Sequence, residues 1–147
     1  MYMHMNRLSI PMAAAICLTA TSLFAQRVPD AKVPSAVRSA LMAKWPDAKG
    51  VTWEKEKGNF EANWGGASKE DNSVLFTPGG SFVEMVVATP VASLPPAIGA
   101  YVKQHYATSK ITEAGKITWP DGRSGYEAEV KGKDLVFDEK GNFIRID

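Results

Sequence analysis

Two halves of this 147-residue chain repeat each other at a distance of 61 positions. The stretch 74–85 matches 135–146, and the apolar positions of 34–45 recur in 95–106. A repeat of this length is typical of a supersecondary unit that has been duplicated. The chain is therefore predicted to contain two copies of one unit, at about residues 33–87 and 94–147.

Between these blocks the distance changes from 61 to 66 positions. VTW at 51–53 matches ITW at 117–119, and FEA at 60–62 matches YEA at 126–128. A structural repeat tolerates insertions and deletions in its connections. The second copy is thus predicted to carry five extra residues before its first strand and five fewer after its second.

Each copy begins with a helical pattern. Pro34 stands where a helix start accepts proline, and Val37, Leu41 and Trp45 follow at four-residue steps until Pro46. The second copy places apolar residues on the equivalent stripe after two prolines: Ile98, Val102 and Tyr106.

Strand patterns follow each predicted helix. Apolar and polar residues alternate in 51–54, 60–64 and 126–131. Gly80 and Gly141 supply the positive φ that the tight turns of the two closing hairpins require. The fold class is therefore α+β, a tandem duplication of a helix plus an antiparallel four-stranded unit, with the helices on one face of the sheet.

The closing hairpins, 74–87 and 135–146, are apolar on both sides if Phe76 pairs with Phe82 and Phe137 with Phe143. One interpretation is that the two copies bury this surface against each other, or that the hairpins are central strands. The other is a protein-binding or peptide-binding surface on the open face of the sheet. Its predicted contact residues are Phe76, Phe82, Phe137 and Phe143.

Residues 1–25 are predicted to be a signal peptide. Arg7 precedes an acid-free stretch, 8–24, and Ala25 provides a small residue at the cut. The alternative is an uncleaved membrane anchor, because 19 residues separate Arg7 from Arg27, although Pro11 weakens it. Cleavage leaves a domain of residues 26–147, periplasmic or secreted, without a stable membrane span.

Removal of residues 1–25 leaves 16 basic and 16 acidic residues and no cysteine, because the single cysteine is Cys17. A neutral chain lacks the excess of positive charge that nucleic-acid binding requires, so no nucleic-acid partner is expected. Without cysteine it has no disulfide, thiol nucleophile or thiolate metal site.

Few residues point to catalysis or metal binding. His105 is the only histidine after residue 25 and is expected on a helix surface. Glu61 and Glu127, which are equivalent in the two copies, and Glu129 are expected to be solvated strand residues. The oxygen-rich segments 121–123 and 138–142 lack the spacing of a calcium loop and are predicted to be turns. No catalytic residue, metal site or cofactor is predicted.

The tryptophans offer an alternative surface for binding glycans. Three of the four lie on the apolar side of an alternating pattern or on the helical stripe, so core packing is the favoured interpretation. The four are Trp45, Trp53, Trp64 and Trp119.

The hairpin sequence VFDEKGNFIR at 136–145 and the helix starts VPSAV at 33–37 and LPPAI at 94–98 resemble the PepSY-like family of β-lactamase-inhibitor-like proteins. The resemblance extends over residues 30–147. It implies a periplasmic or secreted protein in which both copies form one curved sheet, with the helices on the convex side and a concave face that grips a protein. It assigns no contact residue to this chain.

These observations favour a non-enzymatic binding module of the cell envelope, with a protein or peptide partner and a protease or a β-lactamase as the inhibited class. The alternative is a carrier of a small ligand or glycan, or an enzyme whose site has no recognisable motif. A deep pocket with carboxylates around His105 would favour this alternative.

Overall fold

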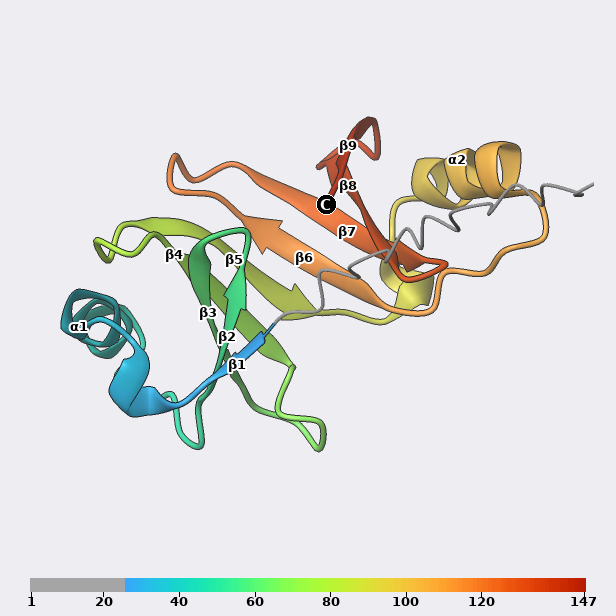
Figure 1. Ribbon diagram of the computed structural model, residues 1–147. Helices are drawn as coiled ribbons and strands as arrows, with labels where there is room; N and C mark the ends of the chain where they lie inside the picture. The colour runs from blue at the N-terminus through green and yellow to red at the C-terminus, as the bar shows by residue number, and fades with distance from the viewer. Residues whose placement is uncertain (1–25) are drawn as a thin grey trace, which may run out of the picture.

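The computed structural model describes residues 26–147 (Figure 1), so the predicted signal peptide lies outside the described residues. After a short first strand, each half consists of one helix followed by four strands. The first half contains β1 (Gln26–Val28), α1 (Ser35–Lys44), β2 (Thr52–Glu56), β3 (Asn59–Trp64), β4 (Asn72–Phe76) and β5 (Phe82–Ala88). The second contains α2 (Pro96–Tyr106), β6 (Ala114–Thr118), β7 (Ser124–Val130), β8 (Lys133–Asp138) and β9 (Phe143–Ile146).

The strands form a single antiparallel sheet in which the order in space is the order in sequence, from β1 to β9. The two halves join where β5 pairs with β6. β1 pairs with β2 at one edge and has no counterpart in the predicted strands. The predicted α+β duplication of a helix and four strands is confirmed.

The helices form where the four-residue apolar steps predict them. Val37 and Leu41 of α1 are buried, as are Ile98 and Val102 of α2. Pro34 precedes the first residue of α1, and α2 begins with a proline. A proline at the start of a helix removes no helical hydrogen bond, because the first N–H groups have no partner within the helix.

Each half has its own apolar core between its helix and the same face of the sheet, here called the helix face. Figure 1 shows α1 and α2 at opposite ends of the sheet. The first core is centred on Val33, Val37, Leu41, Trp53, Phe60, Ala62, Val74 and Phe76. The second is centred on Ile98, Val102, Ala128, Val130, Leu135 and Phe137.

The extra residues of the second half lie between β6 and β7. Trp53 is paired with Ala62 in the first half, and Ala114 is paired with Ala128 in the second. Ala114, and not Trp119, is therefore the structural counterpart of Trp53. The expectation of an insertion before the first strand is wrong, because strand pairing follows the register of the ladder and not a local three-residue match.

A β-bulge interrupts the closing hairpin of the first half. Phe76 lies opposite Phe82, but Leu75 lies opposite Glu84, so Val83 is the additional residue. Side chains on the two sides of a bulge change face relative to simple alternation. Glu84 therefore shares the open face with Leu75 and not the helix face with the phenylalanines.

The second closing hairpin has the same bulge. Phe137 lies opposite Phe143, Val136 lies opposite Arg145, and Ile144 is the additional residue. Arg145 consequently lies on the open face with Val136. The sequence pattern predicts unbroken alternation along both closing hairpins. That prediction is wrong, because the bulges place Glu84 and Arg145 on the open face and not beside the phenylalanines.

The predicted contact phenylalanines lie under or beside the helices. Phe76 and Phe137 are completely buried, with ring centroids 6.1 Å from Trp45 and 5.5 Å from Tyr101, respectively. Their hairpin partners pack against the same two aromatic residues. Burial of these rings against the helices is more favourable than exposure on a bare sheet face. The predicted placement on the open face is wrong for all four: Phe76, Phe82, Phe137 and Phe143.

Candidate functional site

The open face of the sheet contains a hollow of about 230 Å³, which extends from β2 to the end of β9. Its floor includes small and apolar residues such as Gly115 and Val86, but most of its lining is acidic. Ten carboxyl side chains line it, and they are called the acidic face: Glu54, Glu56, Glu61, Glu70, Glu84, Glu113, Glu127, Glu129, Asp134 and Asp147.

The acidic face holds ten of the sixteen acidic residues of the described chain. Within residues 26–147, three basic residues form ion pairs with it: Arg27, Lys57 and Arg145. Outside the acidic face and its three basic partners, residues 26–147 contain six acidic and thirteen basic residues. A neutral composition thus conceals strong segregation of charge between this face and the rest of the molecule.

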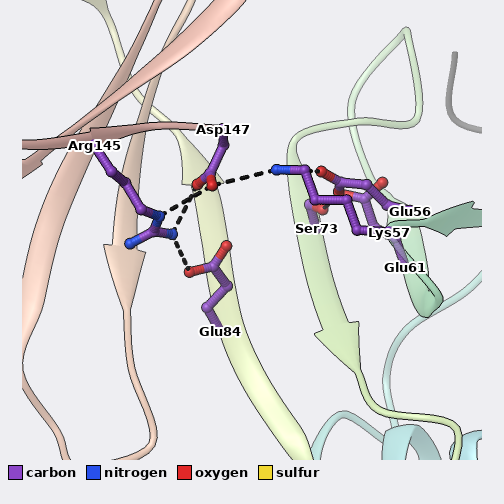
Figure 2. Close-up of polar contacts among 7 residues, drawn as sticks. All are labelled: Glu56, Lys57, Glu61, Ser73, Glu84, Arg145 and Asp147. Carbon is purple, nitrogen blue, oxygen red and sulfur yellow. Dashed lines mark hydrogen bonds and ion pairs between the residues drawn. The ribbon is translucent and has the colours of Figure 1, made fainter. Parts of the chain in front are cut away.

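An ion pair across the hollow shows how strongly the sheet curves. Lys57, in the turn between β2 and β3, places its Nζ 3.4 Å from Oδ1 of Asp147, just after β9 (Figure 2). Six strand spacings separate β3 from β9, roughly 29 Å in a flat sheet. The sheet therefore curls around its open face, which is concave, and carries its helices on the convex side.

Arg145 neutralises one end of the acidic face. Its Nη2 lies 2.7 Å from Oδ2 of Asp147 and 3.5 Å from Oε2 of Glu84, and its Nε donates to Oδ1 of Asp147 at 3.0 Å (Figure 2). Burial by itself raises the pKa of Asp147, but hydrogen bonds and charges from Arg145 and Lys57 bring this pKa below its ordinary value. The forked contact fixes the guanidinium between Asp147 and Glu84.

Glu127 and Asp134 lie on a part of the acidic face that Arg145 does not neutralise. Burial first, and then the charges of Asp134 and Glu84, raise the pKa of the Glu127 carboxyl to about 8. The pKa of Asp134 is raised by burial and then by the charge of Glu129. Among residues 26–147, no lysine or arginine forms an ion pair with Glu127 or Asp134.

Glu61, the equivalent of Glu127 in the first half, has a different environment. Its carboxylate accepts hydrogen bonds from the hydroxyl of Ser73 and, at 3.3 Å, from Nδ2 of Asn63 (Figure 2 shows Glu61 and Ser73). Nearby, burial and then the charge of Glu61 raise the pKa of Glu56. The duplication therefore places two glutamates on one face, but within residues 26–147 neutral side-chain donors reach Glu61 and none reaches Glu127.

The indole of Trp119 lies next to one carboxylate of the acidic face, that of Glu84. A Cβ at Gly125 would lie 2.5 Å from the indole, which shows that the ring packs over this glycine. Its Nε1–H donates to Oε2 of Glu84 at 3.0 Å, and the guanidinium of Arg123 lies 5.8 Å from the ring centroid. The five-residue connection between β6 and β7 thus places an indole beside the carboxylates.

The other tryptophans belong to the first core. Trp53 is buried there, and Trp45 and Trp64 pack against it. The core interpretation is confirmed for these three. The four tryptophans do not share one face, so the alternative of a common aromatic platform for glycans is wrong.

His105 and the oxygen-rich segments 121–123 and 138–142, at which no site is predicted, lie outside the lining of the hollow. His105 is exposed on α2 and stacks on Tyr101 at 4.2 Å, away from the acidic face. Asp121 accepts the N–H of Arg123, and Asp138 accepts backbone N–H groups within its own hairpin loop, so both segments are turns. Glu127 and Glu129 lie on the polar strand face as expected, but Glu127 is half-buried and not simply solvated.

The acidic face as a whole was missing from the sequence-based prediction. Its signal was present in the acidic residues at alternate strand positions, Glu54 with Glu56 and Glu127 with Glu129. In the part of the chain that the structure describes, no three histidine, aspartate or glutamate side chains are arranged to hold a metal ion. No helix within residues 26–147 is long and apolar enough to cross a membrane.

Comparison with known proteins relates both halves to one family. The family model described as "Putative beta-lactamase-inhibitor-like, PepSY-like" matches residues 21–84 and 66–145. No curated protein matches the chain.

Solved structures from Bacteroides have the same fold. A putative periplasmic protein of Bacteroides eggerthii is 20% identical, with a TM-score of 0.61, and the match covers 78% of this chain and 88% of that one. A DUF2874 family protein of Bacteroides uniformis is 22% identical, with the same TM-score and coverage. A BLIP-like protein of Bacteroides fragilis is 23% identical, with a TM-score of 0.55, and the match covers 82% of this chain and 86% of that one.

Proposed function

Because this chain belongs to the PepSY-like family of putative β-lactamase-inhibitor-like proteins, we propose that it is a non-enzymatic binding module of the periplasm or the extracellular space. Its acidic face captures a positively charged segment of a protein. The observation that carries this proposal is the concave, helix-free sheet face with ten carboxyl side chains. The description of the Bacteroides eggerthii protein as periplasmic supports the location.

The shape of the face favours a polypeptide partner. The hollow extends across the strands from β2 to β9, and the indole of Trp119 lies beside one of its carboxylates, Glu84. A long concave surface with an aromatic residue and dispersed charges suits an extended basic segment that contacts several strands. A basic loop of a protease or a β-lactamase would meet this requirement.

The charge distribution also determines how the partner would arrive. Carboxylates that converge on a concave surface focus a negative potential and accelerate the approach of cations. An ammonium or guanidinium that reaches Glu127 or Asp134 would find a carboxyl group that has no basic partner in the described chain. Binding should therefore be strong at low ionic strength and weaken as salt screens the charges.

The test is titration of the purified protein with a fluorescent ten-residue lysine peptide, at low and at high salt. The double variant Glu54→Gln/Glu129→Gln removes two charges from opposite parts of the acidic face. The control Asp47→Asn/Glu139→Gln removes the same number of charges outside it. We expect at least about tenfold weaker binding for the first variant and less than about twofold for the control.

Two results would contradict this function. One is the absence of peptide binding at low ionic strength. The other is an equal loss of affinity in both double variants, which would mean that the peptide responds to net charge and not to the acidic face.

A further inference from the structure

Glu127 has an unusual environment on the acidic face. Its neighbours across the ladder are Gly115 on β6, which has no side chain, and Val136 on β8, which is completely buried. A Cβ at Gly115 would lie 2.9 Å from Oε1 of Glu127 and 2.4 Å from Cγ1 of Val86. The carboxyl group therefore lies over a glycine and next to valine side chains, where a negative charge is poorly solvated.

Nearly all charged groups that face Glu127 carry the same charge. They come from β3, β5, the segment before β6, β7 itself, β8 and the residue after β9. The acidic groups are Glu61, Glu84, Glu113, Glu129, Asp134 and Asp147, and the basic groups on this face are Arg145, Lys57 and Arg27. Arg145 is already paired with Asp147 and Glu84. Lys57 is paired with Asp147 and Glu56, and Arg27 with Glu54, so no lysine or arginine of residues 26–147 is paired with Glu127.

We propose that the acidic face exchanges protons for the positive charges of its partner, so that capture of a cationic segment expels a proton from Glu127. This inference rests on the function proposed above, since it concerns the same face and the same partner. It adds that binding is coupled to pH through one half-buried carboxyl group among its acidic neighbours.

The direction of the coupling follows from the geometry. With a pKa of about 8, Glu127 is about ten times more often protonated than ionised at pH 7. An ammonium group next to it favours the ionised form, so the proton leaves as the cation arrives. Affinity should rise with pH by up to about tenfold per unit between pH 6 and 8 and level off above pH 8.

The experiment is calorimetric titration with the same ten-residue lysine peptide at pH 7, in two buffers that differ in ionisation enthalpy. The difference between the measured heats gives the number of protons released, and we expect about one. Glu127→Gln, which cannot ionise, should bind the peptide and release no proton. Glu139→Gln, which removes a carboxylate from an exposed turn, should release the same number as the wild type.

The outcomes separate this inference from the function on which it rests. Peptide binding with equal heats in both buffers would overturn proton exchange and leave the binding function intact. Proton release that persists in Glu127→Gln would overturn the assignment to this residue. No binding at any pH from 6 to 9 would overturn the proposed function itself. The wild-type comparison requires no variant, so it holds whether or not Glu127→Gln folds.

Discussion

The two faces of the sheet are built from the same strands but have opposite chemistry. In β3, Phe60 and Ala62 point into the first core, whereas Glu61 and Asn63 lie on the open face. The helix face contains two apolar cores under two helices, and the open face contains ten carboxyl groups around a hollow. Alternation along each strand thus separates the groups that stabilise the fold from those available for binding.

This separation shows why an apolar pattern alone is a poor guide to a binding surface. Phenylalanines near a turn are more often part of the core, and here both hairpins place them under a helix. The concave face is polar and partly destabilising, because half-buried carboxyl groups such as Glu127 lose hydration without gaining an ion-pair partner. Substitutions should therefore have opposite effects on the two faces.

The largest effect is expected in the cores. Phe76→Ala and Phe137→Ala each remove a completely buried ring, so the free energy of unfolding should fall by about 3–5 kcal/mol. Phe143→Ala, at a side chain that is 37% exposed, should cost about 1 kcal/mol. Urea denaturation measures all three. Similar losses at Phe76 and Phe143 would show that the two are not packed differently.

Much of the fold could be predicted from local sequence patterns. The helical stripes, such as Val37 with Leu41, and the alternation in β3 and β7 depend on residues near each other in the chain, and the duplication supports each assignment twice. The closing strands could not be assigned to faces in the same way. One extra residue, Val83 or Ile144, reverses the direction of the side chains that follow it, and nothing in the composition marks this position.

The candidate site needed long-range structure as well as alternation. The sequence places Glu61 and Glu127 on a polar strand face, but it does not show that the sheet curls until Lys57 meets Asp147. The curl results from strand twist accumulated over nine strands. The position of Trp119 depends on the register of β6 with β7. The local sequence match of Trp119 to Trp53 predicts the wrong register.

An intermediate effect, with the opposite sign, is expected at Glu127. Its pKa is about 8 in the folded protein and 4.5 in an unfolded chain, so the folded state loses stability as pH rises between these values. Glu127→Gln should leave stability unchanged near pH 4 and increase it at pH 9. The full shift would correspond to about 5 kcal/mol, and partial solvation reduces the expected gain to about 2 kcal/mol.

Urea denaturation at the two pH values measures this difference. The control is Glu139→Gln, in an exposed turn outside the acidic face, which should change stability by less than about 0.5 kcal/mol at either pH. A loss of stability in Glu127→Gln at pH 9 would show that the ionised carboxylate is stabilising, contrary to the comparison of the two faces.

The smallest effect is expected at the rim of the hollow, where Lys57 contacts Asp147. Lys57 has a φ of +47°, so Lys57→Asn removes the ammonium group while keeping a residue that tolerates this backbone conformation. Lys57 is 55% exposed, and the variant should lower the free energy of unfolding by about 0.5 kcal/mol or less. Because a competing cation is lost, the lysine peptide should bind about two to five times more tightly.

The matched control is Lys131→Asn. Lys131 has a φ of +56° in the turn between β7 and β8, followed by a glycine as Lys57 is, and it forms no ion pair within residues 26–147. Both variants lose one positive charge in the same type of turn, so only the position relative to Asp147 differs. Equal gains in peptide affinity in the two variants would mean that the effect of Lys57→Asn comes from the change in net charge and not from the position of Lys57. A stability loss above about 1.5 kcal/mol in Lys57→Asn alone would instead mean that the curl of the sheet depends on this ion pair, because an exposed pair is otherwise too weak to produce it.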